Sequence, residues 1–283
     1  MTHRIGTVRT LSRLRRAIAN FREAGETIAL VPTMGALHEG HLSLVRLAQR
    51  RADRAVVSIF VNPTQFAPHE DLATYPRTFA ADLAALSHLR ADLVWAPGAD
   101  LMYPADFATR IAPEGPALVG LEDRFRPHFF GGVATVVAKL LLQCLPDIAV
   151  FGEKDYQQLM VVTQMVKDLA VPVKIIGGRT VREQDGLAMS SRNAYLSASE
   201  RAAAPALYRV LRRCAETIGD GQDVDVALAD GRADIERSGF AVDYLEARHA
   251  HTLKPLGARE RPLRLLVAAR IGSTRLIDNI GIP

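Results

Sequence analysis

Two histidines three positions apart, His38 and His41, form the most chemically suggestive motif of this chain. They follow an apolar, strand-like run at 27–32 and open a helix-patterned stretch at 42–51. The amides and dipole of a helix N-terminus attract anions, and Gly40 lets the backbone approach closely. Both imidazoles lie on one face of the first turn and can donate to phosphate oxygens. The motif therefore predicts a triphosphate site.

Two other interpretations of the histidine pair remain open. Paired histidines can bind a metal, although zinc-binding helices usually carry them at i and i+4 with a third ligand elsewhere. They can also be ordinary loop histidines with no ligand.

A group of polar residues at 62–66 follows the next strand-like run and is therefore expected at the same edge of a sheet. It contains Asn62 and Gln65. Amide side chains bind hydroxyl and carboxylate groups without adding charge, which suits a small organic acid. The alternative is a simple Asn-Pro turn.

A lysine follows the fourth strand-like run. Lys154 lies beside a glycine in an arginine-rich chain where lysine is scarce. A lysine at a strand end is a compact cation for phosphates, and Gln158 lies one helical turn further on the same side. The alternative is a surface ion pair of Lys154 with Glu153 or Asp155.

A fourth motif, at 185–193, combines Gly186 with two hydroxyls and a cation, Ser190, Ser191 and Arg192. Such a segment could close over a bound nucleotide as a mobile phosphate clamp. A helix cap beside a surface arginine explains the same residues equally well.

The elements that carry these motifs alternate between strand-like and helix-like through the first two thirds of the chain. We expect strands at 27–32, 55–61, 92–96, 147–152 and 173–176, and helices at 41–51, 79–89, 133–143 and 156–169. Apolar runs without alternation are typical of strands buried on both faces, so the pattern predicts a doubly wound α/β domain with a parallel sheet. Ligands of such sheets bind beyond the carboxyl ends of the strands. The segment 97–132 breaks the rhythm and is either functional or contains short elements.

The pattern changes after a Gly-Gly pair at 177–178. Helices are expected at 198–218 and 225–236, and strands at 242–247, 263–269 and 275–279. We therefore predict a Rossmann-like domain at 1–178 and a smaller α+β domain at 179–283, which would act as a lid.

Composition excludes several classes of protein. The 283 residues are 48% hydrophobic and 23% charged, which is typical of a globular protein, and the net charge is only +4. The pI of 9.3 comes without a dense basic cluster, so no nucleic-acid partner is expected. Cys144 and Cys214 are isolated, which indicates a reducing compartment. With no secretory signal and no apolar run long enough for a bilayer, we expect a cytoplasmic protein without a membrane partner.

The motifs together closely resemble the pantoate–β-alanine ligase family, from about residue 11 to the end. The matching segments are 31–41, 57–66, 75–78, 151–158, 185–193 and 276–279. This family belongs to the nucleotidyltransferase superfamily that includes class I aminoacyl-tRNA synthetases. The segment 38–41 is similar to the HIGH motif of that superfamily, and 189–192 to its KMSKS loop.

The resemblance implies an ATP-dependent ligase with Mg²⁺ that acts in two steps. Pantoate attacks the α-phosphorus of Mg-ATP to give pantoyl-adenylate and pyrophosphate, and β-alanine then attacks the acyl carbon to give pantothenate and AMP. It also implies a homodimer formed through the N-terminal domain.

The resemblance further implies roles for individual residues. His41 would be the proton donor, and the catalytic group would also include His38, Lys154 and Arg192. Gln65 and Gln158 would bind pantoate, Gln65 would also contact β-alanine, and Asp82 would lie near the magnesium. The implied ATP-binding residues are Met34, Gly35, Ala36, Leu37, His38, Glu39, Gly40, His41, Gly152, Glu153, Lys154, Asp155, Val181, Met189, Ser190, Ser191 and Arg192.

The chain departs from the family pattern at 126–133. The family commonly has Arg-Pro-x-His-Phe-x-Gly-Val there, whereas here the histidine is His128, one place earlier. Phe129 and Gly131 occupy the positions of the usual family residues. Either a rearranged loop or a packing role for this position is compatible with the sequence.

Two alternative functions are weaker. A nucleotidyltransferase that adenylylates a phosphate monoester would need more cations than the two glutamines and the second domain supply. A non-catalytic RNA-binding relative would need a basic face with many aromatic residues, but aromatic content is only 6%.

Overall fold

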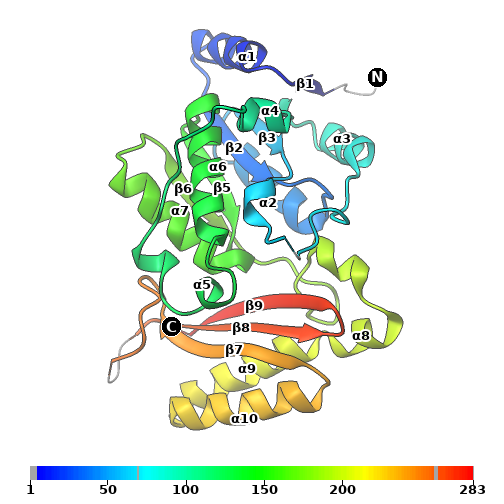
Figure 1. Cartoon of the computed structure of the whole chain (residues 1–283), viewed down its shortest axis with the longest axis vertical. Helices are drawn as coiled ribbons and strands as arrows, with labels where there is room; N and C mark the ends of the chain where they lie inside the picture. The colour runs from blue at the N-terminus through cyan, green and yellow to red at the C-terminus, as the bar shows by residue number, and fades with distance from the viewer. Residues whose placement is uncertain (1–4, 69, 258–260, 283) are drawn as a thin grey trace.

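A six-stranded parallel sheet forms the centre of the N-terminal domain (Figure 1). The computed structural model describes residues 5–68, 70–257 and 261–282. Within them the strands lie in the order β1-β4-β3-β2-β5-β6. Their bounds are β1 Gly6–Val8, β2 Ile28–Thr33, β3 Arg54–Ile59, β4 Leu93–Trp95, β5 Ile148–Gly152 and β6 Lys174–Gly178. The predicted α/β class with a parallel sheet is confirmed.

Helices cover both faces of this sheet because successive strand residues point to opposite sides. Leu30 of β2 faces a core that includes α1, α6 and α7, whereas Val31 faces a core that includes α2 and α3. The helix bounds are α1 Leu11–Glu23, α2 Glu39–Gln49, α3 Phe79–His88, α6 Phe129–Cys144 and α7 Tyr156–Asp168. Strand residues of both kinds are fully buried, which explains the unbroken apolar runs in the sequence.

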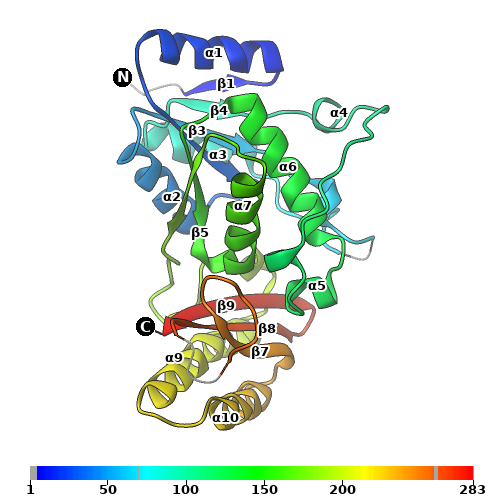
Figure 2. The same cartoon turned by 90° about the vertical axis from the view of Figure 1, so that its left-hand side faces the viewer.

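A three-stranded antiparallel sheet, β7-β8-β9, forms the second domain. Its strands are β7 Ala241–His249, β8 Leu263–Ile271 and β9 Thr274–Ile282. The helices α9 Ala206–Gly219 and α10 Val224–Arg237 lie on the face turned away from the N-terminal domain (Figure 2). The predicted division after residue 178 falls between the two sheets and stays a prediction.

Most expected elements are present, with bounds shifted by a few residues, but the single helix expected at 198–218 is wrong. The structure has α8 Ala198–Ala203 and, separately, α9 from Ala206. Pro205 lies between them and cannot donate the backbone hydrogen bond that a continuous helix requires. The strand β1 was not predicted, because three residues are too few to show a pattern.

The irregular segment 97–132 contains short elements. They are α4 Ala99–Met102, the 3₁₀ turn η2 Gly115–Ala117 and α5 Glu122–Phe125. The first turn of α6 also falls within it, because α6 begins at Phe129, and the segment carries Glu122 to the boundary between the domains.

Several buried contacts join the two domains. The buried carboxylate of Glu122 accepts two hydrogen bonds of 2.8 Å from Arg275 of β9 and one of 2.8 Å from the Tyr244 hydroxyl of β7. The Tyr156 hydroxyl donates to the carbonyl of Ala250 at 3.0 Å. Strand β9 therefore lies directly beneath the N-terminal domain, with α1 at the far end of the molecule (Figures 1 and 2).

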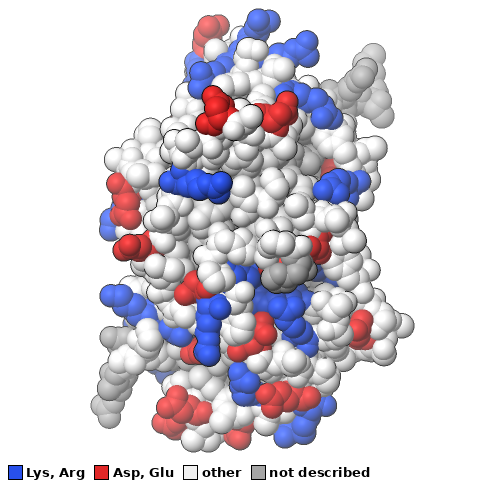
Figure 3. Space-filling model, in the orientation of Figure 1, with Lys and Arg blue, Asp and Glu red and all other residues white. Residues whose placement is uncertain are grey.

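Basic and acidic side chains are interspersed on the face shown in Figure 3. Among the described residues, no helix is long and apolar enough to span a bilayer.

Candidate active site

The sheet reverses its strand order between β2 and β5. From β2 the chain runs outward through β3 and β4, and it then returns to place β5 on the other side of β2. Ligands of doubly wound sheets bind at such a switch point, beyond the carboxyl ends of the strands. The histidine motif follows β2 and the lysine motif follows β5, so both lie at this position.

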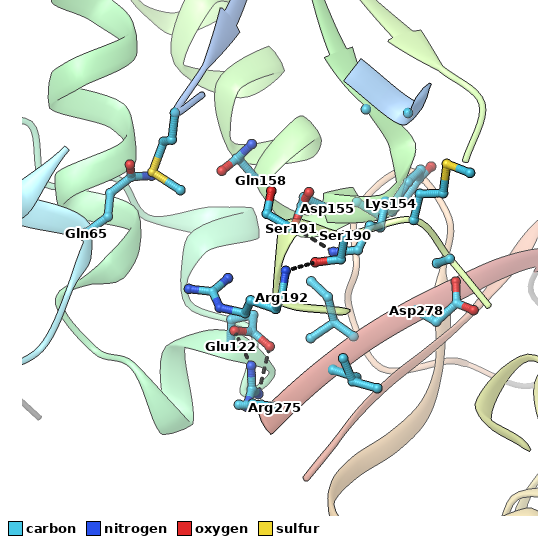
Figure 4. Close-up of a pocket in the computed structure, with 18 of the residues that line it drawn as sticks. Gln65, Glu122, Lys154, Asp155, Gln158, Ser190, Ser191, Arg192, Arg275 and Asp278 are labelled. Atoms are coloured by element: carbon cyan, nitrogen blue, oxygen red, sulfur yellow. Dashed lines mark hydrogen bonds and ion pairs between the residues drawn. The ribbon is translucent and has the colours of Figure 1, made fainter. Parts of the chain in front are cut away.

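A cleft of about 850 Å³ opens there, between the two domains. Figure 4 shows Gln65 and Lys154 at opposite ends of the cavity and the segment Ser190–Arg192 between them. The four motifs singled out in the sequence therefore meet in one cavity, although they come from both domains. The predicted site residues that line it are Met34, His38, Gly40, His41, Gln65, Gly152, Lys154, Asp155, Gln158, Val181, Met189, Ser190, Ser191 and Arg192.

The two histidines form a reciprocal cap at the start of α2. Nδ1 of His38, the N-cap residue, accepts the amide of Gly40 at 3.1 Å, and Nδ1 of His41 accepts the amide of His38 at 3.4 Å. An Nδ1 atom that accepts a hydrogen bond is unprotonated, so each neutral ring carries its proton on Nε2. Both imidazoles are thus held as N–H donors, with ring centroids 4.1 Å apart.

The electrostatic environment keeps both rings neutral. Burial lowers the pKa of His41 to about 3, and the neighbouring His38 adds to this effect. Burial, together with the Lys154 cation, lowers the pKa of His38 to about 4. At neutral pH both rings are therefore uncharged, and each can donate one hydrogen bond from Nε2.

The loop before the histidines is held by Asp82. Gly35 and Ala36 have positive φ angles of 81° and 49°. The buried Asp82 carboxylate accepts the amides of Ala36 at 3.1 Å and Leu37 at 2.9 Å, and the Thr78 hydroxyl at 3.0 Å. It does not line the cleft. The structure thus gives Asp82 a role in shaping the loop, and its place near magnesium stays a prediction.

The turn that carries Lys154 is held from the second domain. Nδ2 of Asn279 on β9 donates to the carbonyls of Glu153 at 2.9 Å and Lys154 at 2.8 Å. Arg264 of β8 pairs with the Glu153 carboxylate at 3.4 Å and contacts Asn279 Oδ1 at 2.9 Å. The alternative pairing of Lys154 with Asp155 is present, but at a long 3.7 Å. Lys154 also lines the cleft.

Gln65 lies in the 3₁₀ turn η1, Pro63–Gln65, which packs against the start of α6. Asn62 Nδ2 donates to the carbonyl of Gly132 at 3.3 Å. A Cβ atom on Gly132 would lie 2.4 Å from the Thr64 carbonyl oxygen, so only glycine permits this approach. The Asn-Pro turn is therefore present, and it places the Gln65 side chain at the cleft wall, while the binding of pantoate by Gln65 stays a prediction.

The family departure at 126–133 forms the start of α6 and part of the same wall. The Arg126 guanidinium lies over the Phe129 ring, 3.9 Å from its centroid, and it donates to the Gln65 carbonyl at 2.9 Å and to Glu70. Phe129 lines the cleft, whereas Gly131 does not. Phe129 therefore packs against an arginine that supports Gln65.

Some predicted ATP-binding residues do not line the cleft: Gly35, Ala36, Leu37, Glu39 and Glu153. Glu39 instead forms a surface ion pair with Arg46. Gly35 and Leu37 shape the loop through backbone conformation and amides. Their part in ATP binding stays a prediction, and the contacts seen are structural.

Sequence reasoning missed several residues of the cleft, among them Asp71, Tyr75, Glu122 and Arg275. Glu122 lies in an irregular segment and Arg275 on a strand of the other domain, so no short motif connects them. Tyr75 begins the matching segment 75–78, Arg275 directly precedes the segment 276–279, and Asp71 lies between 57–66 and 75–78, but sequence reasoning assigned none of them a role.

The comparisons with known proteins agree on one family. The model of the pantoate-beta-alanine ligase family matches residues 6–281. A pantothenate synthetase of Nitrobacter hamburgensis is 64% identical over 275 residues, which cover 97% of each chain. A solved pantothenate synthetase of Thermus thermophilus has a TM-score of 0.93 at 48% identity, covering 98% of this chain and 99% of that one.

A pantoate-beta-alanine ligase of Francisella tularensis, solved with beta-gamma ATP and beta-alanine, has a TM-score of 0.83 at 35% identity, covering 98% of this chain and 97% of that one. These matches extend over nearly the whole chain and include both domains. The chain therefore belongs to the pantoate–β-alanine ligase family.

Proposed function

We propose that this protein condenses pantoate with β-alanine at the expense of ATP, through a pantoyl-adenylate. The observation that carries the proposal is the meeting of two neutral histidine donors, one lysine and two glutamines in a single interdomain cleft. These are groups for a triphosphate and for a hydroxy acid, respectively. Family membership supports the same activity.

In the first step a pantoate carboxylate oxygen attacks the α-phosphorus, and the bond from this phosphorus to the bridging oxygen breaks to release pyrophosphate. Negative charge grows on the α-phosphate and the leaving group. Catalysis of phosphoryl transfer is mainly positioning and electrostatic stabilisation, so donors that are already oriented contribute most. His38, His41 and Lys154 supply these donors, and Arg192 adds a cation from the second domain.

In the second step the β-alanine amine attacks the acyl carbon, the bond to AMP breaks, and the amine loses a proton. Gln65 and Gln158 are suited to hold the pantoyl group through its hydroxyl and carbonyl oxygens, because amides can both donate and accept. Gln65 also contacts β-alanine in this proposal, as the family resemblance implies.

Magnesium is best treated as part of the substrate Mg-ATP. Among the described residues no group of three or more His, Cys, Asp or Glu side chains could hold a metal. Mg²⁺ commonly keeps its waters and binds substrate phosphates rather than an all-protein cage. A homodimer and a cytoplasmic location complete the proposal, and both rest on the family resemblance and the composition.

The test is exchange of labelled pyrophosphate into ATP, with pantoate and magnesium present and β-alanine absent. We expect exchange that depends on pantoate, because adenylation precedes the need for an amine. As a control, β-alanine replaces pantoate and should support no exchange. An enzyme that binds ATP but shows no pantoate-dependent exchange would contradict the proposal and indicate another acceptor.

A further inference from the structure

The segment 185–195, here called the lid loop, bridges the two domains. Its base belongs to the second domain: Arg182, just before it, pairs with Asp278 of β9 at 2.6 Å. Its tip, the 3₁₀ turn η4 Ser191–Tyr195, rests on the N-terminal domain. The tip is therefore held by contacts that can break without unfolding either domain.

Three side chains make the contacts of the tip. The Ser191 hydroxyl donates to the carbonyl of Ala36 at 3.3 Å, and the Tyr195 hydroxyl donates to the carbonyl of Thr74 at 3.4 Å. Arg192 donates to Asp71 through Nε at 3.1 Å and Nη2 at 3.0 Å. Only the last contact joins two charges, and its two parallel bonds fix the orientation of the guanidinium.

Asp71 engages one edge of the guanidinium. The Nη1 side makes no hydrogen bond to a described residue, although the arginine lies in the cleft beside Ser190 and Ser191 (Figure 4). A guanidinium has five N–H donors in a planar fork, so the second edge can bind a phosphate while the first stays on the carboxylate.

We propose that Asp71 is a positioning residue for Arg192: it seats the lid loop and turns the free edge of the guanidinium toward the ATP phosphates. This inference rests on the proposed adenylation function. In this proposal Asp71 contacts no substrate and acts on the reaction through the arginine, while its side-chain hydrogen bond with Tyr195 helps to seat the same loop.

The surroundings favour a lasting ion pair. Burial opposes the positive charge of Arg192, but the hydrogen bonds and charge of Asp71 more than offset this and raise the arginine pKa. Asp155 and the Tyr75 hydroxyl also face the guanidinium. With two acidic side chains nearby, Arg192 stays charged inside the cleft.

A matched ion pair lies far from the cleft and provides the control. Arg54 and Glu26 also form parallel hydrogen bonds, and their side chains are 36% and 24% exposed, against 32% and 22% for Arg192 and Asp71. The two pairs are partly buried to a similar extent, so the control matches the general effect of losing such an ion pair. A special effect of Asp71 would therefore come from its place in the cleft.

The experiment is a double-mutant cycle with Asp71→Ala, Arg192→Ala and the double variant, and with Glu26→Gln as the control. For each protein, ATP affinity is measured by calorimetry, KM for ATP and kcat by pantoate-dependent pyrophosphate exchange, and lid-loop mobility by hydrogen–deuterium exchange of its amides. Asp71→Asn is included because it keeps the size and one acceptor oxygen. Urea unfolding checks that each variant is folded.

We expect Asp71→Ala to weaken ATP binding about tenfold and to speed hydrogen exchange of the lid loop, with Asp71→Asn in between and Glu26→Gln unchanged. The double variant should be no worse than Arg192→Ala, because Asp71 acts only through that residue. Additive losses, or tighter ATP binding in Asp71→Ala, would overturn the proposal. Since calorimetry needs no pantoate, a coupled loss of ATP affinity without any exchange would refute the proposed reaction but not the role of Asp71.

Discussion

The two sides of the cleft are built in different ways. On the N-terminal side, His38 and His41 are fixed by their own helix cap and by the Asp82 carboxylate behind the loop. On the opposite side, Arg192 lies on a loop whose tip is held by three polar contacts to the other domain. The first side is held by contacts within the N-terminal domain, whereas the other depends on how the domains meet.

This difference suggests a division of labour. Donors that must be aligned with a developing charge gain most from a rigid support, since no reorganisation is then needed during the reaction. A cation that must admit ATP and release pyrophosphate gains from a support that can open. The lysine turn is intermediate, because it belongs to one domain and is held by Asn279 of the other.

The largest effect is expected on the N-terminal side. His41→Ala removes a half-buried, pre-oriented donor, and we expect pantoate-dependent exchange to fall on the order of a thousandfold with the fold intact. His88→Ala, on the exposed surface of α3, is the control for losing a histidine. Unchanged turnover in folded His41→Ala protein would remove His41 from the catalytic group.

The free energy of unfolding should decrease at low pH, because the folded protein keeps these histidines neutral. The folded pKa of His41 is about 3, against 6.5 when exposed, so between these values the unfolded chain binds a proton that the folded chain does not. Stability must therefore fall as the pH drops below about 6.5. For His41 alone the loss is about 2 kcal/mol at pH 5 relative to pH 7.5.

Urea unfolding of the wild type and His41→Gln at the two pH values measures this loss. The variant should lose less stability on acidification than the wild type. If the wild type and the variant lost the same free energy of unfolding on acidification, the pKa of His41 in the folded protein would not be lowered.

A smaller effect is expected at the contact between the domains. Asn279→Ala removes both hydrogen bonds to the lysine turn, and we expect pyrophosphate exchange to slow about tenfold, since partly buried carbonyls lose their donor. Asn279→Asp should be worse, because a carboxylate cannot donate and repels the carbonyl oxygens. If the role is to position Lys154, Asn279→Ala will add nothing to Lys154→Ala.

The smallest effect is expected inside the histidine motif itself. Glu39 lies between the two histidines in sequence, yet its side chain is 46% exposed and pairs with Arg46 on the surface of α2. Glu39→Gln should therefore change the KM for ATP and the turnover by less than about twofold. A tenfold change would show that the motif acts as a unit rather than through its histidines.

The parallel sheet of the N-terminal domain and the position of the site at its edge could be predicted from the sequence. Long apolar strands followed by short polar motifs predicted the parallel sheet, and the same motifs indicated a nucleotide site at its edge. Local patterns suffice here because an unbroken apolar run and a helix cap are both set by residues close together in the sequence. They fail where a single residue overrides a pattern, as Pro205 does when it divides the helix expected at 198–218.

Which distant residues share the cleft depends instead on long-range packing. Asp71 and Arg192 are 121 positions apart, and Glu122 and Arg275 are 153 apart. Asp82 shows the same limit, since its contacts to the loop at 36–37 depend on how α3 packs against the sheet. The partners of a charged side chain are set when distant elements meet in the folded chain, which no local pattern of residues records.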